Sequence, residues 1–317
     1  MDVNGAGDLT ENLPHRLIEG DAFDALDLID DNSCRLIITS PPYNIGKEYE
    51  RDQKRSLNEY LEWLRPIVSK ITDKVTDDGH VCWQVGNYVN NGEVFPLDYY
   101  FYEMFTSAGF KLRNRIIWHF NFGLHAMKRF SGRYETMLWF TRSDDYFFQL
   151  EPVLVPQIYP GKRHSRSKGA KAGTPSGNPK GKNPSDFWTF SPSEAFVDSP
   201  IWELPNVKAN HPEKTIHPCP FPSELVERCI LALTETGDNV LDPFVGTGTS
   251  VIAADKHKRI GIGIDQSAAY VDLAKERLEN HKSGRLFTRP MGRPVRRPKE
   301  GEGVATVPAE WLTEAAE

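Results

Sequence analysis

The sequence predicts an α/β fold in which helices cover both faces of a mostly parallel, twisted sheet. Short apolar runs alternate along the chain with stretches of helical periodicity, which is the pattern of successive strand and helix units. Two segments rich in glycine or proline directly follow apolar runs, as expected where strands end at the ligand-binding edge of such a sheet. With 317 residues, the chain is long enough for one full α/β core and one inserted region.

The first block of regular structure lies in the N-terminal part of the chain. Residues 34–39 (CRLIIT) are mostly apolar and include β-branched residues, which predicts a buried strand. Asp78-Gly79 is expected to end the helix that follows before the next strand begins. The further expected elements are strands at 80–85, 111–118 and 135–140 and helices at 57–75 and 95–107.

The pattern breaks between residues 143 and 210, where Pro, Gly, Lys and aromatic residues recur without a sustained period. This composition predicts an irregular insertion rather than a layer of the core. Regular structure returns with helices at 223–234, 249–257 and 267–280 and strands at 239–241 and 259–264. We therefore expect a core built from residues 1–142 and 211–281, an insertion at 143–210, and a basic, disordered tail at 282–317.

Composition places the chain among soluble globular enzymes, with 39% hydrophobic and 26% charged residues. No apolar run approaches the roughly 18 residues that a membrane helix needs, and the polar N-terminus lacks the order of a secretory signal. We therefore expect a cytoplasmic protein without a membrane role. The four cysteines, Cys34, Cys82, Cys219 and Cys229, form no CxxC pair, so we expect reduced, packed thiols and neither a zinc site nor a disulfide framework.

The net charge of −6 hides two basic clusters. No acidic residue lies between Glu151 and Asp186, and the tail from 282 to 299 also contains only basic charges. The affinity of a protein for nucleic acid depends on where Lys and Arg gather more than on the net charge. Taken alone, the two clusters are as compatible with a solvated loop and a disordered tail as with binding to nucleic acid. The cations of the first cluster are Lys162, Arg163, Arg166, Lys168, Lys171, Lys180 and Lys182.

A glycine-rich turn, DPFVGTG at 242–248, lies where a predicted strand gives way to a helix. Glycines there let the backbone approach a ligand closely. Asp265 ends the next strand nineteen positions after Gly246, where an acidic residue in such folds binds ribose hydroxyls. Val251 replaces the third glycine of the dinucleotide fingerprint and no Lys is placed to bind phosphate, which favours a nucleoside without pyrophosphate over NAD. The alternative is a tight turn without a ligand.

The second motif, Ser40-Pro41-Pro42-Tyr43, also follows an apolar strand. The two prolines fix φ and remove two backbone donors, so carbonyl groups there are able to point outward as acceptors. Ser40 adds a hydroxyl acceptor, and Tyr43 adds a ring that is able to stack on a base flipped out of a duplex. Accepting both hydrogens of an exocyclic amino group, from Ser40 and the Pro41 carbonyl, would turn its lone pair toward an electrophile. The alternative is a Pro-Pro turn closed by a packed aromatic ring.

Together, the two motifs resemble one family, the DNA amino-methyltransferases, in which S/D/N-P-P-Y/F/W is the catalytic motif and F-x-G-x-G binds S-adenosyl-L-methionine. The catalytic motif precedes the cofactor motif, which is the circularly permuted order of the family's β-class. The resemblance covers most of the chain and implies a Rossmann-like methyltransferase fold with a target-recognition region between the motifs. Other family-like segments are Gly20-Asp21, Asp78-Gly79 before VCWQVGN, RYETMLWF at 133–140 and HPCPFP at 217–222.

The resemblance also implies roles for individual residues and a direct in-line transfer of methyl to an exocyclic amino group of a flipped base. No metal is implied. The catalytic residues would be Ser40, Pro41, Pro42 and Tyr43. The cofactor would contact Asp21 near its adenine, Asp265 at its ribose, Asp242, Phe244, Gly246 and Gly248 at its methionyl side, and Ser223 at its carboxylate. The duplex would be held by Lys162, Arg163, Arg166, Lys168 and Arg133.

The base that accepts the methyl group is expected to be cytosine. In the family, Ser at position 40 is commoner among N4-cytosine enzymes and Asp among N6-adenine enzymes, so adenine N6 is the alternative. Pro218-Cys219 resembles the nucleophile site of enzymes that methylate cytosine at carbon 5. It lies just upstream of the cofactor motif and has no Glu-Asn-Val partner, so we do not expect Cys219 to act as a nucleophile.

The expected partner is double-stranded DNA. A homodimer and a cognate restriction endonuclease are further partners that the family allows. A competing hypothesis is a catalytically idle DNA-binding protein or an enzyme that modifies RNA. The intact Ser40, Tyr43, Gly246 and Asp265 argue against an idle protein.

Overall fold

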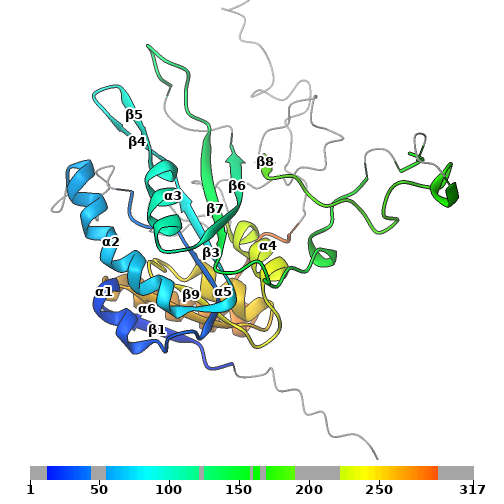
Figure 1. The fold of residues 1–317 in the computed structure, drawn as a ribbon. Coiled ribbons are helices and arrows are strands. Elements are labelled where there is room, and N and C mark those ends of the chain that lie inside the picture. Colours follow the sequence, from blue (N-terminus) through cyan, green and yellow to red (C-terminus); the bar gives the residue numbers. More distant parts are fainter. Residues whose placement is uncertain are drawn as a thin grey trace, which may run out of the picture.

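An eight-stranded sheet forms the centre of the fold, and an arm extends far from one side of it (Figure 1). The computed structural model describes residues 13–43, 55–120, 125–157, 160–164, 169–189 and 222–291. Its elements are β1 (Arg16–Glu19), α1 (Ala22–Ala25), η1 (Leu26–Leu28), β2 (Cys34–Thr39), α2 (Leu57–Lys74), β3 (Val75–Val85), β4 (Asn87–Asn90), β5 (Glu93–Pro96), α3 (Leu97–Ser107), β6 (Lys111–His119), β7 (Tyr134–Thr141), η3 (Glu151–Val153), η4 (Gly169–Lys171), β8 (Phe187–Thr189), α4 (Ser223–Leu233), β9 (Asn239–Asp242), α5 (Thr249–Lys256), β10 (Ile260–Asp265) and α6 (Ala268–Lys282).

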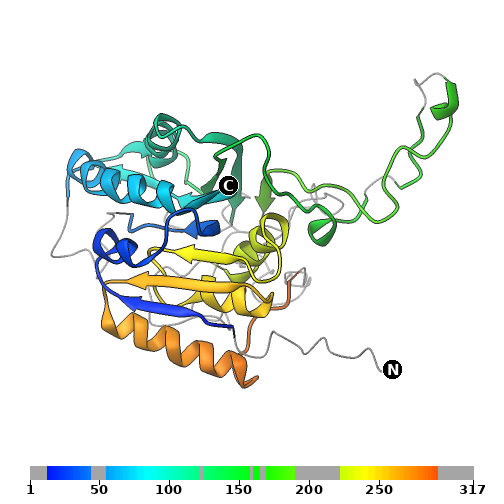
Figure 2. The same ribbon diagram turned by 60° about the horizontal axis from the view of Figure 1, so that its bottom comes forward.

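The strand order of the sheet brings together segments that are far apart in the sequence. From one edge the described strands follow the order β1-β10-β9-β2-β3-β7-β6-β8. The neighbouring strands from β1 to β3 are parallel, and Figure 2 shows β1, β10 and β9 side by side. β7 is antiparallel to both β3 and β6, and β8 is parallel to β6. The sheet is therefore mostly parallel, as the sequence predicts.

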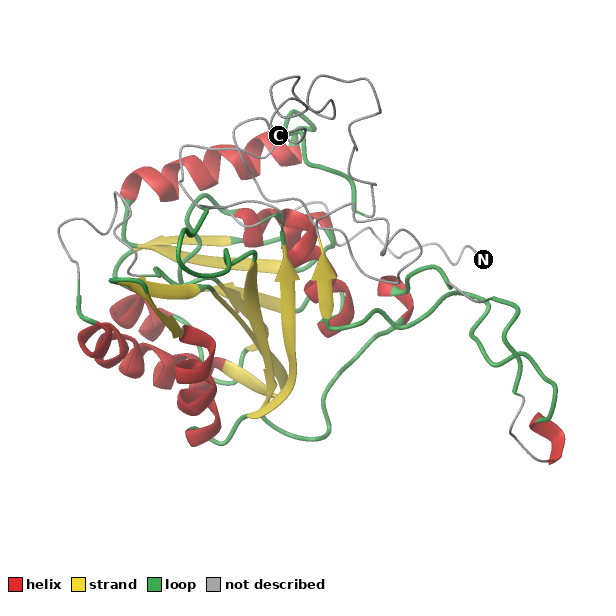
Figure 3. Cartoon of the chain, turned by 90° about the horizontal axis from the view of Figure 1, so that it is seen from above, coloured by secondary structure: helices red, strands yellow, loops and turns green. Residues whose placement is uncertain are grey.

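Two apolar cores cover the two faces of the sheet. On one face, α1, α2 and α3 bury side chains such as Ile71 and Phe101. On the other face, α4 buries Leu225 and α5 buries Ala253, while α6 packs against β1, β10 and α5. Figure 3 shows helices on both sides of the sheet. Because β2 is buried on both faces, its sequence is nearly uniform in apolar character rather than alternating.

Most of the predicted elements are confirmed to within two residues of their expected ends. The short elements β1, α1 and β8 and the β4–β5 hairpin were not anticipated, because each is too brief for a periodic pattern to emerge. The larger error concerns β3, which begins five residues earlier than expected.

Asp78-Gly79 does not separate α2 from the next strand, so that prediction is wrong. β3 begins at Val75, directly after α2, and includes the dipeptide. Pairing with β2 shifts between Cys34–Val75 and Leu36–His80, so residues 76–79 bulge out of the regular register. A Cβ atom at Gly79 would lie 2.9 Å from the carbonyl oxygen of Arg35, and a close backbone approach of this kind requires glycine.

The region expected to be an irregular insertion contains only η3, η4 and β8 among its described residues. Both of its described ends nevertheless contribute to the core, because Val153, Val155 and Trp188 are buried and β8 joins the main sheet. Between these ends, the chain runs out and back as the arm of Figure 1, whose two sides are joined by isolated bridges. Residues 190–210 of the expected insertion lie outside the described part.

The described cysteines agree with the expectation of packed thiols. Cys34, Cys82 and Cys229 are free and buried, and burial raises the pKa of the Cys34 thiol to about 11. Cys219 lies outside the described residues. None of the described helices combines the length and the apolar character that crossing a bilayer demands.

A buried carboxylate joins the strand ends that carry the two motifs. Asp242 is the last residue of β9 and is 1% exposed. Its Oδ1 accepts hydrogen bonds from Thr39 Oγ1 at 2.6 Å and from the backbone N–H of Phe244 at 3.1 Å, and its Oδ2 accepts one from Ser250 Oγ at 2.6 Å. Burial raises the pKa of Asp242 to about 6, because the three hydrogen bonds only partly offset the loss of water.

Replacing Asp242 with Ala is expected to lower the free energy of unfolding by about 2–5 kcal/mol, since two buried hydroxyl donors and one partly buried N–H lose their acceptor. Urea unfolding followed by tryptophan fluorescence measures this change. Asp242→Asn keeps one acceptor oxygen and should lose roughly half as much. An Ala variant as stable as the unmodified protein would show that Asp242 does not hold the strand ends together.

Candidate active site

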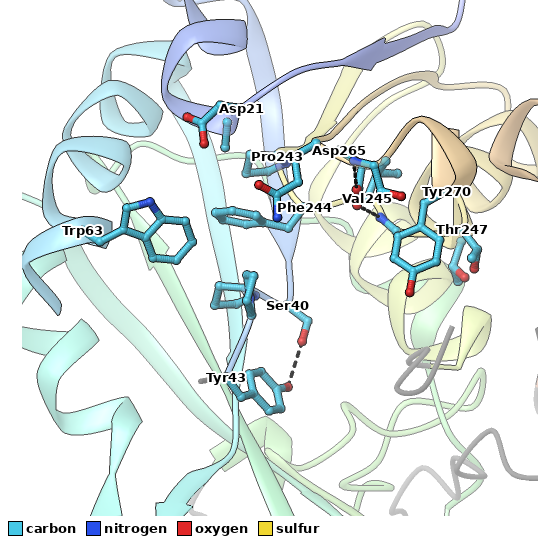
Figure 4. A pocket seen from close by; sticks show the side chains of 17 residues that line it. Asp21, Ser40, Tyr43, Trp63, Pro243, Phe244, Val245, Thr247, Asp265 and Tyr270 are labelled. Carbon is cyan, nitrogen blue, oxygen red and sulfur yellow. Dashed lines mark hydrogen bonds between the residues drawn. The ribbon is translucent and has the colours of Figure 1, made fainter. Parts of the chain in front are cut away.

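A pocket lies at the carboxyl ends of β2, β9 and β10, between the two motifs (Figure 4). The chain continues from β9 to one side of the sheet and from β2 to the other, so these neighbours flank a topological switch point, where open α/β sheets bind ligands. The pocket encloses about 980 Å³ including its open mouth. It is lined by Asp21, Ala22, Ser40, Pro41, Pro42, Tyr43, Trp63, Pro243, Phe244, Val245, Gly246, Thr247, Thr249, Asp265, Gln266, Ser267 and Tyr270.

The backbone of the turn between β9 and α5 has, at two positions, a left-handed conformation that favours glycine. Gly246 and Gly248 have φ values of +51° and +83°. A Cβ atom at Gly248 would lie only 2.8 Å from the Cβ atom of Ala274 in α6. The backbone N–H of Val245 donates to the carbonyl oxygen of Ile264 at 2.9 Å, which ties the turn to β10. The turn is therefore held in one conformation close to α6.

Asp265 ends β10 at the wall of this pocket. Its Oδ2 accepts a hydrogen bond from the N–H of Gly246 at 3.0 Å, and its Oδ1 accepts one from the N–H of Ser267 at 2.8 Å. Partial burial raises the pKa of the Asp265 carboxyl, against the effect of these two hydrogen bonds. A carboxylate offers about four acceptor positions, so Asp265 retains the capacity to bind hydroxyl groups of a ligand.

Aromatic side chains reach the pocket from three separate elements. Trp63 comes from α2, Phe244 from the turn and Tyr270 from α6, and Figure 4 shows Phe244 between the other two. The ring centroids of Trp63 and Phe244 are 6.2 Å apart. Asp21 caps α1 by accepting a hydrogen bond from the N–H of Phe23 at 2.8 Å, and its exposed side chain stands at the rim. Apolar walls with two carboxylates suit a nucleoside ligand.

The Ser40-Pro41-Pro42-Tyr43 motif lies at the lower end of the same pocket in Figure 4. Ser40 Oγ donates a hydrogen bond to the Tyr43 hydroxyl at 2.8 Å, and that hydroxyl donates to Glu135 Oε2 at 3.3 Å. Tyr60 in α2 donates from its hydroxyl to the carbonyl oxygen of Pro42 at 2.7 Å. The motif is therefore fixed by contacts with α2 and β7 as well as by its own prolines.

The structure brings most of the sequence-predicted cofactor residues to this one pocket. Asp21, Phe244, Gly246 and Asp265 all line it, together with the catalytic motif. The remaining three do not. Asp242 is buried in the junction described above, Gly248 packs against Ala274, and Ser223 is a buried residue at the start of α4.

The sequence-predicted DNA-binding residues lie in two places. Lys162 and Arg163 are exposed on the arm, and the Arg163 guanidinium donates to the carbonyl oxygen of Gly173 across it. Arg133 directly precedes β7 at the edge of the sheet that carries the pocket. Arg166 and Lys168 lie outside the described residues.

Several residues of the site were missed by sequence reasoning. Trp63 and Tyr270 line the pocket from helices whose spacing predicts only an amphipathic helix. Glu135 belongs to the family-like segment at 133–140, but no local signal places its side chain beside Tyr43. The described residues include no group of three or more His, Cys, Asp or Glu side chains suited to a metal ion.

Comparison with known proteins identifies relatives over most of the chain. Residues 34–276 match the family model described as DNA methylase (N6_N4_Mtase). Over 261 residues the chain is 43% identical to the type II methyltransferase M.BglII of Bacillus subtilis, an alignment that covers 82% of this chain and 68% of that protein.

Two solved structures have a similar fold. The Thermus thermophilus protein TTHA0409, complexed with S-adenosyl-L-methionine, has a TM-score of 0.55 and 26% identity, covering 85% of this chain and 97% of that chain. PvuII DNA methyltransferase (cytosine-N4-specific) has a TM-score of 0.60 over 87% of this chain and 96% of that chain, and at 18% identity it demonstrates a shared fold alone. This chain therefore belongs to the N6/N4 family of DNA methyltransferases.

Proposed function

We propose that this DNA methyltransferase modifies the exocyclic N4 amino group of cytosine at a specific site in duplex DNA. The observation that carries the proposal is that Ser40 and Tyr43 line the same pocket as the glycine turn and Asp265. The acceptor oxygens of the motif therefore stand beside the cofactor site. Ser40 favours cytosine, since the family resemblance associates Ser at this position with N4 enzymes, and adenine N6 is the alternative product.

In this proposal, Asp265 binds the ribose of the cofactor and Asp21 lies near its adenine. Phe244 and Gly246 would hold its methionyl side. Ser223 is buried at the start of α4 and does not line the pocket, so it is not part of the proposed cofactor site. Asp242 and Gly248 act indirectly, by holding the turn in place. The proposed cofactor is S-adenosyl-L-methionine. When bound, it supplies a methyl group on a cationic sulfur, and this sulfur is a good leaving group.

The chain's own task is to position the target nitrogen and to exclude water. Ser40 Oγ and the Pro41 carbonyl accept the two amino hydrogens, so that the nitrogen lone pair faces the methyl group. After the transfer the positively charged nitrogen releases one of these hydrogens as a proton to solvent, which leaves a neutral methylated base. Tyr43 stacks on the flipped base and offsets part of the few kcal/mol that flipping costs. Pro42 keeps the motif rigid, with its carbonyl oxygen held by Tyr60.

Target recognition is assigned to the region at 143–210, with residues 1–142 and 211–281 as the catalytic and cofactor-binding halves. The arm presents Lys162 and Arg163 in the open, and Arg133 approaches from the edge of the sheet that carries the pocket. Contacts from these cations to phosphates would orient the duplex over the pocket. The relationship to a type II methyltransferase supports a role beside a cognate restriction endonuclease.

The first test of this proposal is the product. Genomic DNA from a host that expresses the chain should contain N4-methylcytosine by nucleoside mass spectrometry. Tyr43→Ala should lower turnover by about tenfold to a hundredfold, because base–aromatic stacking contributes roughly 1–3 kcal/mol. Ser40→Ala should be slowed less, since the Pro41 carbonyl still accepts one hydrogen.

Cys219→Ala is the control for this experiment, and it should retain methyl transfer. Detection of N6-methyladenine as the product would show that adenine, the alternative, is the target base. Detection of 5-methylcytosine, together with an inactive Cys219→Ala variant, would exclude amino-group transfer altogether.

The second test concerns the arm. Replacing Lys162, Arg163, Arg166 and Lys168 together with Ala should weaken DNA binding and flatten its dependence on salt, because fewer counterions are released. Fluorescence anisotropy at several salt concentrations gives the slope, which should fall by up to about 0.9 for each lost phosphate contact. Matched changes at Arg16, Arg65, Lys258 and Lys275, which are exposed and lie outside both basic clusters, should leave the slope unchanged. Equal slopes for the arm variant and the unmodified protein would exclude the arm from phosphate binding.

A further inference from the structure

A continuous chain of hydrogen bonds links the catalytic serine to a carboxylate on a neighbouring strand. Ser40 Oγ donates to the Tyr43 hydroxyl at 2.8 Å, and the Tyr43 hydroxyl donates to Glu135 Oε2 at 3.3 Å. The direction of the chain follows from its last member. Because an ionised carboxylate only accepts hydrogen bonds, Tyr43 must donate to Glu135, and its oxygen is then available to accept from Ser40.

This direction matters because a serine hydroxyl carries a hydrogen of its own. If that hydrogen pointed at the substrate, Ser40 would oppose an amino hydrogen instead of accepting it. Donation to Tyr43 turns the hydrogen away and leaves the lone pairs of Ser40 Oγ for the amino group. The acceptor character of Ser40 therefore depends on where the hydrogen of Tyr43 goes.

Glu135 is itself held in place. Gln84 in β3 donates from its side-chain amide to the same Oε2 atom that accepts from Tyr43. Gln84 is 2% exposed, and its strand pairs with β7 next to Glu135, where Val85 lies opposite Thr136. A Cβ atom at Gly86 would lie 3.6 Å from both the Tyr43 ring and the Glu135 side chain, so the backbone after β3 borders both.

We propose that Glu135 is the positioning residue that makes Ser40 a hydrogen-bond acceptor for the target amino group, acting through Tyr43. This proposal rests on the proposed function, in which Ser40 accepts an amino hydrogen. Glu135 does not touch the base in this mechanism. It fixes the hydrogen of Tyr43, and Tyr43 fixes the hydrogen of Ser40.

A carboxylate at position 40 would not need this device, since it has no hydrogen to turn away. The contribution of Glu135 should therefore disappear when Ser40 is replaced by Asp. A residue that merely stabilised the fold would matter equally in both backgrounds, so this comparison separates the two roles.

The experiment measures kcat and KM on an unmethylated duplex that contains the enzyme's target site. The variants compared are Glu135→Leu, Glu135→Gln, Ser40→Asp and the double variant Ser40→Asp/Glu135→Leu. Glu135→Leu should lower kcat by about 10- to 100-fold and leave the KM for S-adenosyl-L-methionine within about twofold. Glu135→Gln should recover most of the rate, because its amide oxygen still accepts from Tyr43. The double variant should match Ser40→Asp.

A second double-mutant comparison, which does not use Ser40→Asp, keeps the proposal testable if that variant is inactive. Tyr43→Phe keeps the ring and removes the link, so combining it with Glu135→Leu should cost no more than either change alone. Additive losses of kcat in this second comparison would overturn the proposal. So would a loss of kcat from Glu135→Leu that is as large in the Ser40→Asp background as in the unmodified enzyme. The product made by the unmodified enzyme is measured separately, so failure of this proposal is distinct from failure of the proposed function.

The loop between β6 and β7 exposes two large apolar side chains. Met127 and Phe130 are 93% and 101% exposed, the largest exposures among the exposed large apolar residues of the described chain. Lys128 and Arg129 lie between them and are also exposed. A hydrogen bond from the N–H of Ala126 to Ser131 Oγ at 3.1 Å closes the loop. Apolar side chains held in water at the tip of a basic loop mark a binding surface.

The loop stands at the edge of the sheet that carries the active site. β7 is antiparallel to β3, and Thr136 near its start lies opposite Val85 at the carboxyl end of β3. In Figure 1 the segment before β7 rises beyond this edge. A duplex that presents a base to Ser40 and Tyr43 would therefore lie within reach of the tip.

We infer that Phe130 inserts into the base stack of the bound duplex and helps to hold the target base outside it. The partner is double-stranded DNA, so this inference also rests on the proposed function. Inserted apolar side chains open a base step at the cost of base stacking, and here the opening would favour flipping. Lys128 and Arg129 would meet the phosphates on either side.

The test compares a fully paired duplex with the same duplex lacking the base opposite the target, where the stack is already open. Phe130→Ala should slow methylation of the paired duplex about tenfold and that of the open duplex by less than about twofold. Phe287→Ala, an exposed phenylalanine beyond the end of α6, is the matched control and should affect neither. Equal effects of Phe130→Ala on both duplexes, or none on either, would exclude the insertion, while the product analysis tests the proposed function independently.

Discussion

The carboxylate of Asp242 is the contact on which the arrangement of the site depends. It accepts hydrogen bonds from Thr39 at the end of β2, from the N–H of Phe244 in the turn, and from Ser250 in α5. Thr39 and Asp242 are 203 positions apart in the sequence. A buried carboxylate is costly unless its hydrogen bonds are complete, so a shift of either strand would leave both the charge and its donors unsatisfied. The two motifs consequently meet in one geometry.

With the two strand ends fixed, other elements need to supply only single side chains. α2 is anchored in the core through Leu64 and Ile67, and its other contacts reach the site, where Tyr60 holds the Pro42 carbonyl and Trp63 lines the pocket. β7 is anchored by pairing with β3 and contributes Glu135. Each contributing element is thus rigid for reasons unrelated to chemistry, which keeps the site precise.

The fold and both motifs were predictable because their signals lie in consecutive residues. β2 is apolar on both faces and two prolines follow it after Ser40, and the turn after β9 contains two glycines at positive φ. The misjudged start of β3 has a physical cause. Asp78-Gly79 carries the local signal of a turn, whereas the bulge that absorbs it exists only through pairing with β2. A signal confined to neighbouring residues does not report that pairing.

The contribution of Glu135 could not be predicted, because it depends on strand register between distant segments. Its segment is recognisable as a strand, yet only the pairing of β7 with β3 brings the side chain to Gln84 and Tyr43. Members of the family with Asp in the catalytic motif carry a carboxylate at the position of Ser40. In the proposed mechanism, this protein keeps a carboxylate at the site but places it 92 positions after Tyr43, through which it is connected. Both arrangements present an oxygen whose lone pairs face the amino group. In this protein the acceptor therefore depends on Glu135 as well as on Ser40, the first residue of the motif.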